Sequence, residues 1–267
     1  MTAVSALGAL AMLVSTAFAL CTFDRWRRGH RAHELAWTQS LVMFAAGSFA
    51  YWAAGSLGWH SWNFRAFYLF GAILNVPYLA VGTLYLLGGE RIGRPVHRAL
   101  HVVAAFCAGV VLVSPFRTRL PASGLPEGKL VFGVGPRLMA GVGSGVGATI
   151  LIVGAVWSAV QLVRTRRRPA AGAAPSIPAG RLAVTNALIA LGSIVLSLGG
   201  TFFTGADLEV GFGVFLVAGI LILFGGFLLS GSSPRTVAAA EPPPGLDDFG
   251  LELWLLLNEP VAAGGDT

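Results

Sequence analysis

Runs of apolar residues with almost no charge recur along this chain and limit what it can fold into. A helix needs about 20 mostly apolar residues to cross a bilayer. Seven runs approach this length, at about 3–23, 36–57, 65–88, 99–115, 138–163, 182–203 and 208–230. Charged residues make up only 11% of the 267 residues, against about a quarter in soluble domains. We therefore predict an all-α integral membrane protein, with a seven-span helix bundle over residues 1–230 and a cytoplasmic tail over 231–267.

The basic residues indicate how the spans are oriented. Most of the 18 lysines and arginines fall in the tail or in the connections after the first, third and fifth spans. These are Arg25, Arg27, Arg28, Arg31, Arg91, Arg94, Arg98, Arg164, Arg166, Arg167, Arg168, Arg181 and Arg235. Positively charged loops stay in the cytoplasm, so we expect the amino end outside and the carboxyl end inside a bacterial cytoplasmic membrane. The net charge of +6 then reflects orientation, and the lipid bilayer, not nucleic acid, is the expected partner.

The first run and the tail each carry a further expectation. Residues 1–20 have no charge and the arginines follow the first run, which favours an uncleaved helix over a signal peptide. In the tail, the amphipathic segment 249–257 is too short to span. It either lies at the membrane interface, docks on a protein partner through residues 245–267 or on the protein's own cytoplasmic face, or is disordered.

The order of the spans suggests an internal duplication. Spans one to three and spans five to seven both follow the order helix, arginine-rich connection, helix, short outer turn, helix. This order predicts a 3+1+3 parallel repeat, as found in some transporters. The alternative is a chance likeness between apolar helices.

A polar residue and a proline interrupt the third span. Asn75 needs hydrogen-bond partners in lipid, and Pro77 removes a helix hydrogen bond. Together with Tyr78, and with Asn186 of the sixth span, they are candidates to line a solute path. The alternative is a kink whose freed carbonyl is satisfied by a neighbouring side chain. Gln39 and Asn186 are also candidates for hydrogen bonds between helices.

Glycines alternate along the fifth span, at Gly141, Gly143, Gly145 and Gly147. The run contains a formal match to the dinucleotide-binding fingerprint, but that fingerprint requires a preceding strand and a βαβ unit. The spacing instead predicts close helix packing, through Gly141 with Gly145 and Gly143 with Gly147.

Four histidines are expected on the cytoplasmic side. His30 and His33 follow the first span, and His97 and His101 share one helix face at the start of the fourth. Neutral imidazoles bind zinc and other transition metals, so the four form a candidate metal site. Neighbouring arginines oppose a cation there, and no cofactor is predicted.

Charged residues lie at the ends of the predicted spans and not deep within them. Arg65, Arg137, Asp207 and Glu209 flank outer turns and are candidates for an outer ion-pair cluster. Ion-coupled carriers place carboxylates deeper, which argues against proton-driven transport. The sole lysine, Lys129, lies in an outer connection, which excludes a retinal Schiff base within the spans.

Several stretches carry a resemblance to a known group of proteins. Residues 67–72, 77–85, 124–126 and 136–137 look like those of uncharacterised multi-pass membrane proteins of high-GC bacteria. The resemblance covers most of the membrane part, excludes the tail and implies no activity. The three-one-three layout is also distantly similar to that of SWEET-type sugar carriers. Those carriers have proline in several helices, whereas this chain has only Pro77 inside a span.

Three classes of function remain open. The first is a passive carrier or channel-like protein for a small solute or lipid. The second is a non-catalytic membrane subunit or sensor that acts through its cytoplasmic face and tail. The third is a metal-dependent membrane enzyme that uses the cytoplasmic histidines. The first two are favoured over the third, because no motif in the sequence identifies a reaction.

Overall fold

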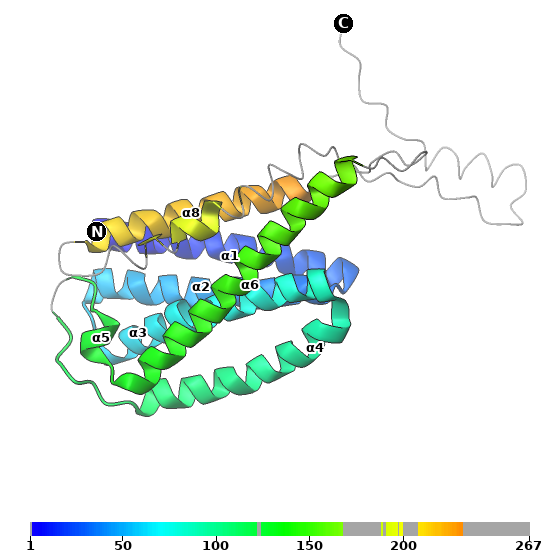
Figure 1. Cartoon of the computed structure of the whole chain (residues 1–267). Helices are drawn as coiled ribbons and strands as arrows, with labels where there is room; N and C mark the ends of the chain where they lie inside the picture. The colour runs from blue at the N-terminus through cyan, green and yellow to red at the C-terminus, as the bar shows by residue number, and fades with distance from the viewer. Residues whose placement is uncertain are drawn as a thin grey trace, which may run out of the picture. The chain divides into compact units, whose positions relative to one another are not determined.

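The computed structural model describes residues 2–121, 124–167, 188, 191–196, 198–199 and 208–231. Its named elements are all helices, shown in Figure 1: α1 (Ala3–Gly29), α2 (Ala32–Leu57), α3 (Ser61–Ala66), the π-helix η1 (Phe67–Leu74), α4 (Asn75–Val113), α5 (Gly128–Val131), α6 (Val134–Arg167) and α8 (Glu209–Gly231). An isolated β-bridge joins Phe116 to Phe132. The predicted all-α class is confirmed for the described residues.

Five described segments are long and apolar enough to cross a membrane. They are Ala3–Gly29, Ala32–Leu57, Ser61–Val113, Val134–Gly154 and Glu209–Leu229. Their outer surfaces carry exposed apolar side chains, such as Val102 at 73% and Val113 at 81% exposure. Lipid is the solvent that suits such a surface, so the protein is embedded in a membrane. The predicted span 182–203 lies mostly outside the described residues, and the tail 232–267 lies wholly outside them.

Helix α4 reverses direction at Gly89, which has φ of 64° and ψ of −169°. Only glycine adopts this conformation without strain. Contacts across the reversal show two antiparallel arms: Tyr85 lies 3.3 Å from His97, and Arg65 of α3 lies 2.8 Å from the Ser114 carbonyl. Figure 1 shows the same reversal in the course of the ribbon.

The predicted span 65–88 is formed by the end of α3, η1 and the first arm of α4, and the predicted span 99–115 by the second arm. The second arm begins before residue 99, because helix continues through residues 90–98. The shortness of the fourth apolar run had left such an early start open. Residues 90–98 contain Arg91, Arg94 and Arg98, and we had assigned them to a loop. Arginine and glutamate are good helix formers, so the helix extends through this polar segment up to the glycine that breaks it.

Helices α1 and α2 pack antiparallel and are joined by residues 30–31 alone. His30 closes α1 in the left-handed conformation, and its N–H donates to the Trp26 carbonyl. Toward the other end of the pair, Gly8 lies so close to Trp52 that a Cβ atom there would be 2.7 Å from the Trp52 backbone nitrogen. Small residues allow this close approach of membrane helices.

Helix α8 packs against α1 through aromatic side chains. The Phe18 ring lies 4.9 Å from the Phe224 ring and 4.8 Å from the Phe227 ring. At the start of α8, the Tyr51 hydroxyl of α2 donates to the Glu209 carbonyl at 2.6 Å. This bond satisfies one polar group in an otherwise apolar contact.

The connection between α4 and α6 is folded where it is described. The Arg117 N–H donates to the Val131 carbonyl at 2.9 Å. Phe132 is fully buried, with ring centroids 5.4 Å from both Phe64 and Phe116. These contacts attach the connection to α3.

Candidate functional site

The interruption of the third predicted span is a π-helix followed by Asn75. Helix η1 ends where the Asn75 N–H donates to the Phe70 carbonyl, five residues back. The Ser40 hydroxyl of α2 lies 2.7 Å from the Asn75 side-chain oxygen and 2.9 Å from its carbonyl oxygen. π-Helical turns are frequent at functional sites, and here the polar side chain is already held by a neighbouring helix.

Pro77 lacks the N–H that would bond an earlier carbonyl in the helix. In the α register that carbonyl belongs to Ile73, and in the π register it belongs to Ala72. The Ser144 hydroxyl of α6 donates to the Ala72 carbonyl at 2.7 Å. Ser144 therefore bonds a carbonyl of the helix break itself, five residues before Pro77.

Two of the four alternating glycines face this kink. A Cβ atom at Gly147 would lie 2.9 Å from the Val76 side chain, and one at Gly143 would lie 3.0 Å from the Ile73 carbonyl. Gly141 and Gly145 have open space where a Cβ would be. The close helix packing that the spacing predicts is therefore present at Gly143 and Gly147, whereas Gly141 and Gly145 pack against nothing among the described residues.

The other path candidates lie in different settings. Tyr78 is buried, and its ring meets those of His97 and His101 edge-on. Asn186 lies outside the described residues. A shallow apolar groove runs over α6, lined by Gly141, Val142, Gly145, Val146, Thr149 and Ile150. Its lining does not include Asn75, Pro77 or Tyr78.

Gln39 of α2 joins the two histidines of α4. The His97 Nε2 atom lies 2.6 Å from the Gln39 Oε1 atom, and the His101 Nε2 atom lies 3.4 Å from the Gln39 Nε2 atom. The second nitrogen of His97 faces the Tyr85 hydroxyl at 3.3 Å, and that of His101 faces the His97 carbonyl at 2.7 Å. The hydrogen bond between helices that we expected of Gln39 is present, and its partners are the candidate metal ligands.

The four histidines do not form one cluster. His30 caps α1 against Trp26, and His33 packs on Trp37 with its Nε2 atom 3.6 Å from a Glu34 oxygen. The described part of the chain has no group of three or more His, Cys, Asp or Glu residues that could hold a metal. The four-histidine site is therefore wrong as a single site, because His30 and His33 turn toward the α1–α2 connection.

The expected outer ion-pair cluster is not formed among the described residues. Arg65 instead donates to the carbonyls of Val111 and Ser114, at the end of the second arm of α4. Its guanidinium carbon lies 4.5 Å from the Phe116 ring centroid. Neither Arg137 nor Glu209 belongs to an ion pair among the described residues. Asp207 lies outside the described residues. Free carbonyls at a helix end attract a cation, which explains the position of Arg65.

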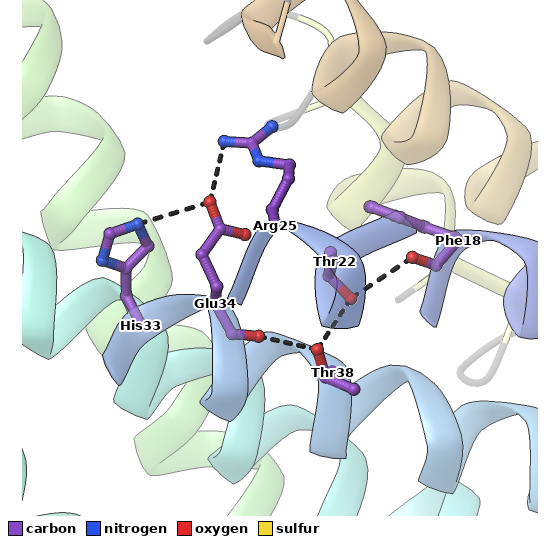
Figure 2. Close-up of polar contacts among 6 residues, drawn as sticks. All are labelled: Phe18, Thr22, Arg25, His33, Glu34 and Thr38. Carbon is purple, nitrogen blue, oxygen red and sulfur yellow. Dashed lines mark hydrogen bonds and ion pairs between the residues drawn. The ribbon is translucent and has the colours of Figure 1, made fainter. Parts of the chain in front are cut away.

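A buried ion pair between α1 and α2 was missed from the sequence. Figure 2 shows Arg25 directed at Glu34, with 2.7 Å between the Nη2 and Oε1 atoms. The Glu34 side chain is 1% exposed and that of Arg25 is 33% exposed. Beneath the pair, the Thr38 hydroxyl lies 2.9 Å from that of Thr22. The signal was present as a carboxylate in the first turn of one helix and a cation near the end of the preceding one.

Comparison with known proteins assigns neither a family nor a function to this chain. No family model, no curated protein and no solved structure matches this chain. A function can therefore be inferred only from the geometry of the chain itself.

Proposed function

We propose that the chain crosses a bacterial cytoplasmic membrane seven times, with its amino end outside and its carboxyl end in the cytoplasm. The contacts between Gln39 and the two histidines support this topology. They bring the α1–α2 connection and the Gly89 reversal to the same end of the helices. Both regions are rich in arginine, as cytoplasmic loops are.

A pair of fusions tests the topology. Green fluorescent protein fused after Thr267 should fluoresce, because it folds in the cytoplasm. Alkaline phosphatase at the same position should be inactive. Active phosphatase and a dark fluorescent protein would place the carboxyl end outside and reverse the orientation.

Within that membrane, the chain acts as a non-catalytic subunit or sensor through its cytoplasmic face and tail. The observation that carries this proposal is that polar groups at the helix break around Asn75 are bonded to neighbouring helices. Ser40 bonds both oxygens of Asn75, Ser144 bonds the Ala72 carbonyl, and Tyr78 is buried. A break whose polar groups are bonded between helices is a feature of a packed bundle.

Deletion of residues 245–267 tests this function. The full chain, extracted in mild detergent, should retain a partner that the shortened chain loses, while both keep the same thermal stability. Replacing Trp254 and Leu256 by alanine provides a full-length control, which should also lose the partner. Equal recovery of partners with all three proteins would contradict a role for the tail.

A passive carrier is the second candidate, and the π-helix favours it. A π-helical turn beside a half-buried asparagine and a proline is an arrangement found where membrane helices bind substrates. In a carrier, the Ser40–Asn75 contact would open to admit a small neutral solute.

Vesicle shrinkage tests the carrier. Purified protein in lipid vesicles should admit glycerol or a pentitol faster than empty vesicles do, and Asn75→Leu should abolish the difference. The matched control is Ser144→Ala, which removes a bond to the backbone of the same helix break and leaves the Asn75 side chain in place. Flux equal to that of empty vesicles, or unchanged in Asn75→Leu, would exclude a path along Asn75.

A further inference from the structure

His97 and His101 direct the same ring nitrogen toward one point. They lie four residues apart on the second arm of α4, with ring centroids separated by 4.7 Å. Both Nε2 atoms face the side-chain amide of Gln39, which reaches them from α2. The amide thus occupies the position at which two imidazole nitrogens converge.

The hydrogen bonds assign the protons of this cluster. The Gln39 Oε1 atom only accepts, so the His97 Nε2 atom carries a hydrogen, and the neutral ring accepts from Tyr85 at Nδ1. The Gln39 amide nitrogen only donates, so the His101 Nε2 atom is bare and its Nδ1 hydrogen points to the His97 carbonyl. Every bond in the cluster is satisfied with both rings neutral, which is the form that binds metals.

The far nitrogen of each ring is held as it is in metal sites. A metal-bound histidine usually fixes its other nitrogen by a hydrogen bond to a carbonyl, a carboxylate or water, which sets the direction of the ring. The His97 carbonyl serves His101 in this way, and the Tyr85 hydroxyl serves His97.

We propose that His97 and His101 bind a divalent transition-metal cation such as Zn²⁺ through their Nε2 atoms. The Gln39 Oε1 atom is the third ligand, and water completes the coordination. Before binding, the His97 hydrogen moves from Nε2 to Nδ1, where the Tyr85 oxygen accepts it, so no net proton is released at this ring. The Gln39 amide moves aside so that only its oxygen faces the cation.

The position and charge of the cluster allow a cation to enter. His101 is exposed toward the Gly89 end of the second arm, which the proposed topology puts beside the cytoplasm, whereas His97 is 8% exposed. Of the charged residues near Tyr85, Arg94 is paired with Glu90, which offsets its repulsion of a cation. Arg98 remains as an opposing charge on the same arm. With two imidazoles and one amide oxygen, the site binds metal less tightly than a four-ligand structural zinc site.

Calorimetric titration of the purified chain tests the site, and its outcome does not depend on the proposed function. The protein carries no histidine tag, is treated with a chelator in detergent and is titrated with Zn²⁺. The wild-type chain should bind one equivalent. His101→Ala should weaken binding about tenfold or more, as loss of a ligand or its support does. Because His101 is exposed, this variant keeps its fold, which thermal unfolding verifies.

Two further variants make the test specific. Gln39→Glu should tighten Zn²⁺ binding about tenfold, since a carboxylate oxygen is a stronger zinc ligand than an amide oxygen. The double variant His30→Ala with His33→Ala removes as much imidazole elsewhere and should leave affinity unchanged. The proposal is overturned by any of three results: no saturable binding in the wild type, equal binding in His101→Ala, or loss of binding only in the His30 and His33 variant. Unchanged affinity in Gln39→Glu would overturn the assignment of Gln39 as a ligand.

Discussion

Removing Arg25 and removing Glu34 from their ion pair should destabilise the protein by different amounts. Glu34 is almost fully buried, and its Oε2 atom has no hydrogen-bond partner among the described residues. Arg25 is one-third exposed, and its guanidinium carbon lies 4.4 Å from the Phe227 ring centroid. Removal of either partner therefore leaves the other charge in a different environment.

Arg25→Met leaves a buried carboxylate whose one remaining ion-pair partner among the described residues is His33, and should cost about 3 to 5 kcal/mol in the free energy of unfolding. Glu34→Leu leaves a cation that reaches solvent and still stacks on Phe227, and should cost about 1 kcal/mol. The double variant leaves no buried charge and should be more stable than Arg25→Met alone, because apolar replacement of a buried pair is often neutral.

The assay is equilibrium unfolding in mixed micelles with increasing dodecyl sulfate, followed by the fluorescence of the 7 tryptophans. Arg28→Met is the matched control, since it breaks the Arg28–Asp24 pair whose side chains are 67% and 51% exposed. That change should cost about 0.5 kcal/mol or less. Equal costs for the two single variants at the buried pair, or a double variant whose cost is their sum, would refute the reasoning.

The same assay tests two glycines, each against a glycine in open space. Gly147→Ala should destabilise the protein by about 1 to 3 kcal/mol, because its Cβ would press on the Val76–Pro77 backbone. Gly145→Ala should be neutral. Equal effects of the two changes would contradict the packing of α6 on the kink. Gly89→Ala should cost about 1 to 3 kcal/mol because of its positive φ, whereas Gly109→Ala, in the same helix with open space, should be neutral or stabilising. A gain in stability with Gly89→Ala would show that the reversal of α4 does not depend on that conformation.

The elements that depend on local composition were predictable from the sequence. Uncharged apolar runs identified α1, α2, both arms of α4, α6 and α8, because hydrocarbon requires continuous apolar helix. The boundaries were less accurate. Residues 90–98 are polar but helical, since hydropathy reports where lipid ends and not where the helix ends.

The side-chain pairings could not be predicted, because they depend on how the helices rotate against one another. Nothing local to Pro77 indicates that Ser144, 67 positions later, donates to the Ala72 carbonyl of the same helix break. Similarly, the sequence placed His97 and His101 on one face but could not show that Gln39 lies between them. A one-residue change in the register of α2 would have directed another side chain to that point.

The contacts between α1 and α2 limit how these two helices can move against each other. The pair is bonded from Thr2, whose hydroxyl donates to the Gly55 carbonyl at 3.0 Å, to the ion pair of Arg25 and Glu34 beside the two-residue connection. Two helices tied at both ends can neither slide nor splay without breaking several contacts at once. The pair must therefore move as a single rigid body, and any working motion of this protein takes place where the other helices slide or tilt against it.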